Sequence, residues 1–375
     1  MPIWSVMHDR SDEPALLKKL RLRTSNIAKA RLRSWAHARD IAIVRLRPGL
    51  RDARHVVVMV IFNEAPRMPF LLRYYREMGF EHFVILDNNS SDGLQELLAA
   101  ETDVSLFFAT GSFRKTRFGM DWINCLLSKY CVGKWILHVD ADEFLVFPHC
   151  DSQGIAGLTA WMEQNQQPSL QCLMLDMYSD KKIKENICAV GEDPASICPC
   201  FDGTGYVTYY DSMNETFAIK GGVRGRIYFS DNLWNGPALN KTPLVLWRRH
   251  YAFLKCAHEL WPTSVNGGPP APDVPRGVLL HFKFLADLTD KVAAEMVRRQ
   301  HTNEYDAYSR NDRLAADGPN FMGPHSRKYD GWRSLHAAGL LSGAESLAPA
   351  IWSSPDVAAE KTAAMRDKRL AESPP

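Results

Sequence analysis

The 375-residue sequence lacks the features that would place it among membrane-spanning, secreted or repeat proteins. No apolar run approaches the roughly 20 residues that a membrane-spanning helix needs. The longest strong run, 56–62, has the length of a strand. The N-terminus has no basic stretch followed by a long apolar one, so we expect no secretory signal. We therefore expect a globular protein with a cytoplasmic location.

Paired cysteines are also lacking. The eight cysteines are scattered and contain no CxxC pair, which is typical of reduced thiols buried in a fold. Cys188, Cys198 and Cys200 are near one another in sequence, but no fourth zinc ligand stands at a suitable spacing. The pattern excludes a disulfide scaffold and disfavours a structural zinc site.

The sequence has little net charge, +2, but the charge is unevenly distributed. Residues 1–55 hold 13 Lys and Arg against 5 Asp and Glu, a net of +8, which leaves −6 for the rest. Leu, Ile and Trp are mixed with these bases in residues 15–54. We therefore expect this segment to form either a solvated basic helix packed on the body or a segment lying on an anionic membrane surface. Nucleic acid is not an expected partner, since no aromatic and basic platform accompanies the charge.

From residue 56 onward the pattern is that of a wound α/β sheet. Continuous β-branched runs predict strands buried on both faces, and amphipathic segments between them predict helices. The strands are expected at 56–62, 83–86, 104–108, 135–139 and 278–284, and the helices at 69–78, 94–100, 118–130 and 287–300. The expected fold class is α/β, with a mostly parallel sheet flanked by helices and a less regular second half.

The composition changes along the chain predict five segments. They are a basic N-terminal arm, a first half of the α/β domain, a second and less regular half, a helical and loop extension, and a tail expected to be mobile. Their boundaries are 1–55, 56–150, 151–300, 301–342 and 343–375.

Three of the expected strands end in polar residues, and ligands of open α/β sheets bind at the carboxyl ends of strands. Each group is also compatible with a helix cap or a turn. Two carboxylates one residue apart can approach one cation, and such oxygen ligands suit Mg²⁺ or Mn²⁺ bridging phosphate oxygens. The groups are Asn63-Glu64, Asp87-Asn88-Asn89 and Asp140-Ala141-Asp142.

The runs VVVMVIFNEA, VILDNNSSDG and WILHVDADEF resemble the nucleotide-sugar half of a glycosyltransferase with the GT-A fold. The resemblance is closest to family 2-like and family 92-like bacterial enzymes. It is specific over 56–147 and continues more weakly to about residue 300. It implies a nucleotide-sugar contact for Asn63, Glu64, Asp87 and Asn89, metal and diphosphate binding by Asp140 and Asp142, and a late metal ligand in His281.

Three further residues could bind the metal or the diphosphate, and each could instead have a purely structural role. A histidine in an apolar strand is commonly a hydrogen-bonded core residue, so both roles stay open for His281. Lys283 would share the face of His281 on a strand and neutralise a leaving diphosphate, or it is a surface lysine. Arg224, which like Arg226 is flanked by glycine, can approach an anion closely or form a structural ion pair.

The catalytic base is poorly marked in the sequence. Inverting transfer needs a group that deprotonates the acceptor hydroxyl. Glu259 is our preferred candidate, because it precedes the histidine strand and neighbours His258, which joins it as a catalytic candidate. The other candidates are Asp176, Asp180 and Glu215.

The sequence therefore predicts a metal-dependent glycosyltransferase that uses Mn²⁺ or Mg²⁺, located in the cytoplasm and peripherally on the inner face of the membrane. By the resemblance, it transfers a sugar from a UDP-linked donor to a glycan or lipid-linked acceptor with inversion. One alternative is a non-catalytic binding subunit attached to a membrane or complex. The other is a sugar nucleotidyltransferase, which needs a glycine-rich basic loop where this chain has NEAPRMPF.

Overall fold

The computed structural model describes residues 7–9, 16–211, 216–254, 258–267, 273–300 and 320–348. The candidate base Glu215, the first part of the expected extension and most of the expected tail lie outside these ranges.

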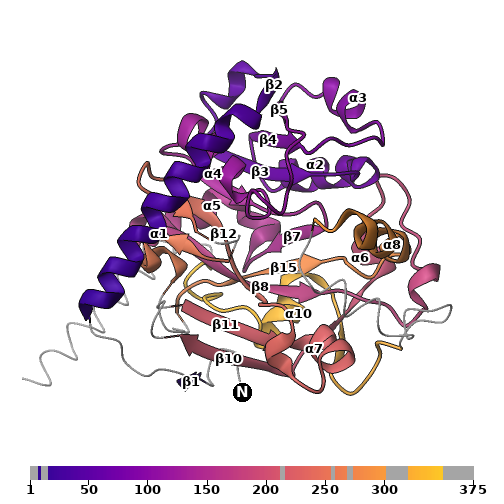
Figure 1. The fold of residues 1–375 in the computed structure, drawn as a ribbon. Coiled ribbons are helices and arrows are strands. Elements are labelled where there is room, and N and C mark those ends of the chain that lie inside the picture. The colour runs from indigo at the N-terminus through magenta and orange to yellow at the C-terminus, as the bar shows by residue number, and fades with distance from the viewer. Residues whose placement is uncertain are drawn as a thin grey trace, which may run out of the picture.

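A nine-stranded mixed sheet runs through the centre of the molecule (Figure 1), in the order β2-β5-β4-β3-β6-β12-β8-β15-β7. Its strands are β2 (Ala42–Arg45), β3 (His55–Ile61), β4 (His82–Asp87), β5 (Val104–Phe108), β6 (Trp135–His138), β7 (Glu143–Val146), β8 (Ser169–Asp176), β12 (Asn240–Leu246) and β15 (Gly277–His281). All but β2, β7 and β12 run in the same direction. The expected α/β class with a largely parallel sheet is confirmed. Of the three antiparallel strands, β2 lies in the N-terminal segment, β7 at the end of the first half and β12 in the second half.

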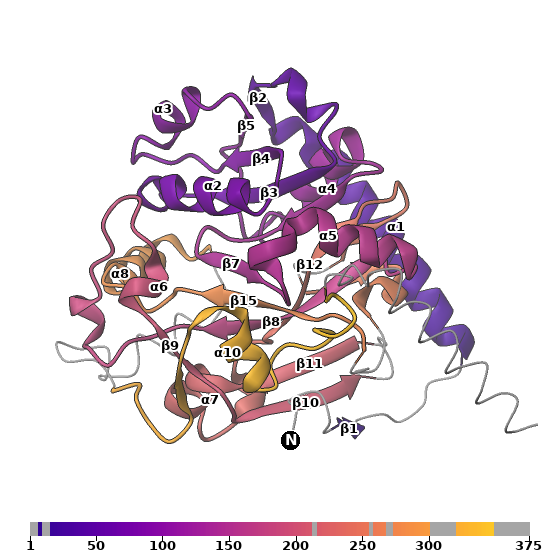
Figure 2. The same cartoon turned by 180° about the vertical axis from the view of Figure 1, so that it is seen from behind.

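Helices cover both faces of this sheet. The helices of the first half and its border are α2 (Met68–Glu77), α3 (Leu94–Ala99), α4 (Met120–Tyr130) and α5 (Cys150–Gln164). Figure 2 shows α2 and α5 in front of the sheet, whereas α4 lies in front in Figure 1. Alternate residues of β3 point to opposite faces of the sheet. Val57 and Met59 pack with α2, α3 and α5 on one face, and Val56 and Val58 pack with α4 on the other. A strand covered on both sides explains the unbroken apolar run in the sequence.

The N-terminal segment packs against the same domain. Helix α1 (Leu16–His37) contacts α4, with Ala30 and Ser34 buried on its inner side. Strand β2 pairs antiparallel with β5 and forms an edge of the central sheet. Residues 42–45 of the expected basic arm are therefore part of the sheet. Among the described residues, no helix is both long and apolar enough to cross a membrane.

The second half adds small sheets and short helices around the central one. The strands are β1 (Met7–Asp9), β9 (Cys200–Asp202), β10 (Tyr206–Asp211), β11 (Thr216–Gly221), β13 (Ala252–Phe253), β14 (Leu260–Trp261) and β16 (Ser326–Lys328), and the helices are α6 (Pro194–Ile197), α7 (Gly222–Tyr228), α8 (Leu288–Arg298) and α10 (Gly331–Ala337). Strands β1, β10 and β11 form one sheet, and β13–β14 and β9–β16 form two-stranded pairs. Strand β15 ends at His281, three residues before the expected end, so residues 282–284 do not continue its alternation.

The buried imidazole of His82 makes the stability of this sheet sensitive to acid. His82 Nε2 lies 2.9 Å from Ser105 Oγ, and burial lowers the pKa of His82 from 6.5 to about 4. Between these values the unfolded chain binds a proton that the folded one does not, so stability falls as pH falls. The full window corresponds to about 3 kcal/mol. We expect H82Q to weaken the loss of unfolding free energy between neutral pH and about pH 5 in urea titrations.

The matched control for this experiment is H325Q, which changes an exposed histidine. We expect the control to keep the pH dependence of the wild type. An H82Q protein whose unfolding free energy varies with pH as steeply as the wild type would contradict the assignment.

Candidate active site

The carboxyl ends of β3, β4, β6, β8 and β15 meet at one edge of the central sheet, because these strands run in the same direction. The polar residues that follow β3, β4 and β6 lie there, together with the last residues of β8 and β15. In the sheet register, His281 stands opposite Asp176 of β8 and Glu143 of β7. Segments far apart in sequence therefore supply one cluster of titratable groups.

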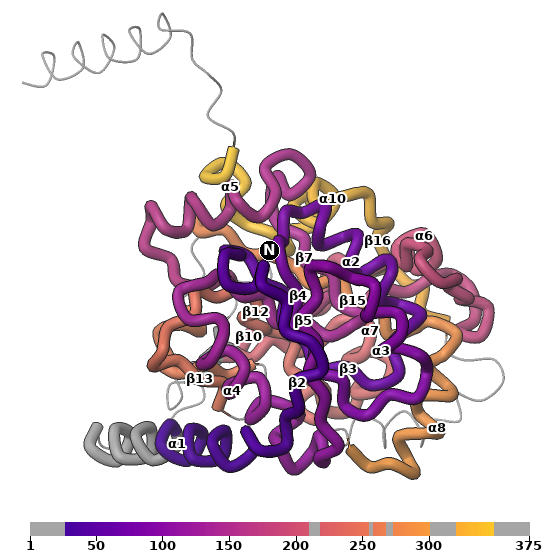
Figure 3. The backbone as a smooth tube through the Cα atoms, turned by 90° about the horizontal axis from the view of Figure 1, so that it is seen from above, coloured from indigo at the N-terminus to yellow at the C-terminus, as the bar shows by residue number. Residues whose placement is uncertain are grey.

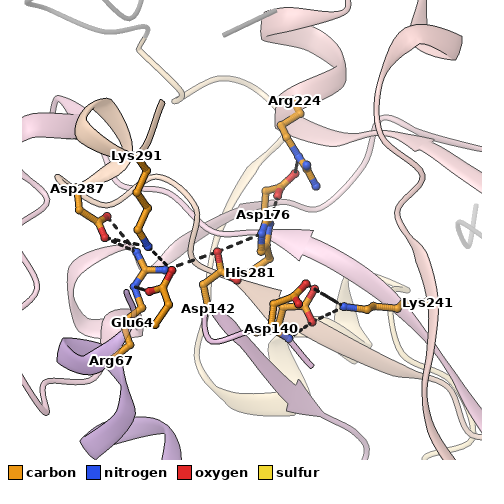
Figure 4. A network of polar contacts seen from close by, with 11 residues as sticks. Glu64, Arg67, Asp140, Asp142, Asp176, Arg224, Lys241, His281, Asp287 and Lys291 are labelled. Atoms are coloured by element: carbon orange, nitrogen blue, oxygen red, sulfur yellow. Dashed lines mark hydrogen bonds and ion pairs between the residues drawn. The ribbon is translucent and has the colours of Figure 1, made fainter. Parts of the chain in front are cut away.

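Asp142 lies between two cations from different parts of the chain (Figure 4). Its Oδ2 is 3.4 Å from His281 Nε2 and 3.6 Å from Arg67 Nη1. Burial raises the pKa of Asp142, but the charges of His281, Arg67 and Lys291 outweigh burial and hold it well below its usual range. Asp142 is therefore an ionised carboxylate.

The imidazole of His281 bridges two carboxylates. Its Nδ1 donates to Asp176 Oδ1 at 2.6 Å, and its Nε2 faces Asp142. Burial lowers the pKa of His281, but the carboxylates of Asp142 and Asp176 outweigh burial and raise it to about 9. The ring is therefore a buried cation that joins β8, β15 and the turn after β6.

Asp176 and Arg224 stand behind this histidine as a buried ion pair. Arg224 Nε donates to Asp176 Oδ2 at 2.7 Å, and both side chains are almost fully enclosed. With one oxygen on Arg224 and the other on His281, Asp176 cannot reach an acceptor hydroxyl as a base. Of the two readings of Arg224, an anion contact or a structural ion pair, the geometry favours the ion pair. Both residues orient His281.

Asp140 belongs to a second group of charges. Lys241 of β12 is buried and binds both oxygens of Glu143 at 2.6 and 2.8 Å and Asp140 Oδ2 at 3.3 Å. Burial lowers the pKa of Lys241, but Asp140 and Glu143 outweigh burial and raise it, so the ammonium stays charged. The side chain of Asp140 is 58% exposed, which leaves it open to solvent and ligands. Asp140 and Asp142 thus take part in separate ion pairs.

The polar residues after β3 and β4 brace each other across the sheet edge. Asp87 accepts from Ser90 N and Gln95 Nε2, and Asn63 Oδ1 accepts from Ser91 N. Asn63 and Asn89 adopt the left-handed backbone region, with φ of 54° and 66°, which asparagine tolerates better than most residues. Asp87 is buried, whereas Asn89 is exposed. These contacts fix a turn that leaves Asn89 facing solvent.

Helix α8 lies over this edge and adds charges to the cluster. Arg67 Nη2 donates to Asp287 Oδ2 at 2.8 Å, and Lys291 Nζ lies 2.6 Å from Glu64 Oε1 and 3.2 Å from Asp287 Oδ2. Burial lowers the pKa of Arg67, but Glu64, Asp287 and Asp142 outweigh burial and raise it. Near the end of α8, the guanidinium of Arg298 lies 3.4 Å from the centre of the Phe62 ring. The helix therefore places two cations, Lys291 and Arg298, over the end of β3.

A pocket of about 260 Å³ opens between these groups. Its lining combines charged and polar residues with aromatic and other apolar ones. Its lining includes Asn63, Glu64, Arg67, Asp142 and Asp287, with Phe70, Phe144 and Phe282. This pocket has the mixed lining of a site for a polar ligand with an apolar part.

The remaining candidates lie at the margins of the cluster. Lys283 follows the end of β15, so the expected alternation with His281 does not apply to it. His258 and Glu259 precede β14, and His258 Nδ1 lies 2.6 Å from the carbonyl oxygen of Asn240, the neighbour of Lys241. His258 and Glu259 are therefore on the Asp140 side of the site.

Asp142 and His281 fit the protein's share of a divalent metal site, provided that Nε2 of His281 gives up its proton when the cation binds. Their facing atoms are 3.4 Å apart, close to the roughly 3 Å expected for adjacent ligands of Mg²⁺ or Mn²⁺. The carboxylate bond to the other ring nitrogen is typical of metal-binding histidines. No three His, Cys, Asp or Glu side chains of the described residues come together as a closed metal site. The two donors suit a cation that takes its other ligands from phosphate and water.

Sequence reasoning missed several members of the cluster. Arg67 stands three residues after Glu64, and Asp287 and Lys291 have the i, i+4 spacing of a helical ion pair, so a local signal existed for both. Lys241 carried no such signal, because its partners lie about a hundred residues earlier in the chain.

No model of a known protein family matches this chain. Two curated plant proteins are similar to part of it. A glycosyltransferase family 92 protein of Arabidopsis thaliana is 30% identical over 115 residues, which covers 28% of this chain and 18% of that protein. Another of Ricinus communis is 27% identical over 106 residues, covering 26% and 17%. The similarity thus spans about a fifth of each plant protein. These two proteins support the predicted resemblance to family 92 glycosyltransferases.

Two solved structures of mannosyltransferases share a weaker likeness. That from Pyrobaculum calidifontis, solved with GDP-mannose and Mn²⁺, has a TM-score of 0.24 and 16% identity over 48% of each chain. Ktr4p from Saccharomyces cerevisiae, solved with GDP, has a TM-score of 0.21 and 9% identity over 49% of this chain and 55% of its own. Likeness at this level assigns no donor and no metal to the present chain.

The buried Arg224–Asp176 pair predicts a strong stability effect. Burial raises the pKa of Asp176, and Arg224 and His281 together lower it below its usual range. R224M removes one of the two cations that compensate a buried carboxylate, so we expect a loss of about 3 kcal/mol in unfolding free energy. Urea titration measures it.

The control is R226M, which breaks a similar pair with Asp202. Asp202 keeps a hydrogen bond from the Tyr178 hydroxyl, and Arg226 is partly exposed, so the loss should be clearly smaller. Equal losses for the two variants would contradict the special role of Arg224.

Proposed function

We propose that the protein is a metal-dependent glycosyltransferase whose donor diphosphate binds at the Asp142–His281 edge of the sheet. The observation that carries the proposal is the position of Asp142, an ionised carboxylate between His281 and Arg67 beside the pocket. The partial similarity to family 92 glycosyltransferases supports it. The likeness to family 2-like and bacterial enzymes stays a prediction.

The charge balance of the site favours a cation together with the diphosphate. In the first group, four acids (Glu64, Asp142, Asp176 and Asp287) meet four bases (Arg67, Arg224, His281 and Lys291). In the second, Asp140 and Glu143 meet Lys241 alone. The sum is −1 with His281 protonated and −2 once His281 gives up its Nε2 proton to ligate a cation, so an added diphosphate needs a further positive charge to be held. A divalent cation on Asp142 and His281, with Asp140 close by along the chain, meets this need.

The chemistry that a bound divalent cation supplies is neutralisation of the charge developing on the leaving diphosphate. The chain's own residues would position His281 and would supply cations that change their ion-pair partners when the diphosphate binds. Arg67 can leave Asp142, and Lys291 can leave Glu64, to contact phosphate oxygens. Each would keep Asp287 as an ion-pair partner when it does so. Asp176 and Arg224 hold the imidazole of His281 in place. We propose nucleotide contacts from Asn63, Glu64 and Asn89, whereas Asp87, which is buried and accepts from Ser90 N and Gln95 Nε2, would support the turn that carries Asn89.

We propose a UDP-linked donor, a glycan or lipid-linked acceptor, and inversion. For the base we retain Glu259, which lies with His258 on the Asp140 side of the site and is not buried. Asp176 is unsuited because both its oxygens are engaged. If folded protein binds no nucleotide sugar, a non-catalytic binding subunit becomes the better account.

The proposal predicts that Asp142 is needed for metal-dependent donor binding. D142N removes the negative charge that a cation requires, and we expect turnover to fall by at least about 100-fold. Calorimetry with UDP-, GDP-, dTDP- and CMP-sugars, with and without Mn²⁺, measures donor binding separately from transfer. One nucleotide class should bind to the wild type with Mn²⁺ and fail to bind to the variant.

D330N is the matched control, because Asp330 is exposed and remote from the cluster in every contact described for it. It should bind donor like the wild type. A D142N protein with full metal-dependent binding and turnover would refute the metal role of Asp142.

Lys291 is predicted to contribute to donor affinity more than to turnover. K291M removes a cation at the solvent side of the cluster, where a charge-assisted bond to phosphate is worth about tenfold in affinity. We expect the donor dissociation constant to rise by about that factor, with turnover at saturating donor within about twofold. The exposed Lys328 supplies the control K328M. Unchanged donor affinity in K291M would exclude a phosphate contact.

A further inference from the structure

Helix α1 and the segment at and after β2 expose apolar side chains that the candidate active site does not use. Leu32 and Trp35 are each 66% exposed and stand three residues apart, so they share one face of the helix. At and beyond β2, Ile43, Val44 and Leu46 are 52, 46 and 47% exposed. Of the exposed large hydrophobic residues among those that the structure describes, five of eleven lie between residues 32 and 46. Such clustering marks an interaction surface.

This surface is held firmly by the fold. Ala30 and Ser34 bury the opposite side of α1 against the body, and α1 contacts α4 and β13. Figure 3 shows α1 lying along one side of the molecule, with β2 following it. Strand β2 is fixed by its pairing with β5. The exposed apolar side chains are therefore presented on rigid elements and not on a loose arm.

Basic side chains surround the apolar ones. Residues 27–54 contain eight Lys and Arg and two Asp, a net of +6. Lys29, Arg31 and Arg33 are exposed beside Leu32, and the Arg39 guanidinium lies 5.5 Å from the centre of the Trp35 ring. Aliphatic and tryptophan side chains within a basic surface match the layered chemistry of a lipid interface, where phosphates lie outside and acyl chains below.

We propose that this face docks on an anionic lipid bilayer. We call it the α1–β2 patch, and its members are Lys29, Arg31, Leu32, Arg33, Trp35, Ile43, Val44 and Leu46. Leu32 and Trp35 enter the boundary between head groups and acyl chains, which tryptophan favours. The lysine and arginines bind the phosphates of the head groups. The patch attaches the protein to the membrane surface without spanning it.

Charge excludes the main competing occupants. A second copy of the chain would bring the three bases of one patch, Lys29, Arg31 and Arg33, against the same three of another, and like charges repel across such an interface. Nucleic acid would match the charge but would leave the exposed leucine, isoleucine and valine side chains without a partner. An anionic bilayer satisfies both the bases and the apolar side chains.

Vesicle sedimentation of the full chain tests the proposal. Wild-type protein should bind vesicles of equal parts phosphatidylcholine and phosphatidylglycerol, bind phosphatidylcholine alone far more weakly, and lose binding as salt is raised. Each basic residue near the surface is worth about fivefold in partitioning. We therefore expect R31E/R33E to bind the mixed vesicles at least about tenfold less. L32S/W35S should bind at least about tenfold less at unchanged charge.

The controls match each variant in chemistry and exposure. V190S changes an exposed valine elsewhere, and R327E/K328E reverses two exposed bases elsewhere. Both should bind like the wild type, and thermal melts of all variants check folding. The proposal is overturned if folded wild type ignores anionic vesicles, or if the controls lose as much binding as the patch variants. It is also overturned if lipid-free wild type is a dimer that L32S/W35S converts to monomers.

Discussion

The buried imidazolium of His281 is the interaction on which the candidate active site depends. Asp142 lies in the turn after β6 and Asp176 ends β8, and both are ionised, so without a cation between them their charges would repel. His281 joins the two, and Arg224 balances Asp176 from behind. The positions of the turn after β6, the end of β8 and the end of β15 are linked by this one ring.

The same principle is repeated on the other side of the Asp140–Asp142 turn. Lys241, enclosed in β12, holds Glu143 and Asp140 as His281 holds Asp176 and Asp142. Each buried cation serves two carboxylates, which lets the fold keep acidic residues together at one edge. The solvent side is different, because Arg67, Asp287 and Lys291 form a set of partly exposed ion pairs whose partners can be exchanged for a ligand. The buried ion pairs of His281 and Lys241 therefore lie on the protein side of the site, and the partly exposed pairs of Asp287 lie on its solvent side.

Helix α8 connects the late part of the chain to the start of the sheet. Its residues contact Glu64, Arg67 and Phe62, which follow β3. The α1–β2 patch is a separate surface formed by the N-terminal segment, and it shares no residue with the charge cluster. The proposed donor binding and the proposed docking on a bilayer therefore depend on separate residues.

Local sequence patterns were enough for the parallel strands of the first half, although they did not predict β7 (Glu143–Val146). The apolar runs at β3, β4, β5 and β6 predicted these strands to within about a residue at each end, because strands covered on both faces need unbroken β-branched sequence. The polar residues after them marked the edge of the sheet where the charged cluster lies, since a parallel sheet collects its carboxyl ends at one edge. Asp142 and His281 were both named from sequence, and both lie at that edge.

The second half depended on tertiary contacts. The sequence alone determined that a wound sheet exists and that acids follow its strands. It did not show that β2 joins the sheet, that β15 stops at His281, or that Lys241 lies beside Asp140. Only the tertiary structure decided these, because a buried ion pair is set by distant segments packing together and leaves no periodic trace in either one. It also showed that Asp176 is buried with one oxygen on Arg224 and the other on His281, because burial and partners are set by packing and not by residue type.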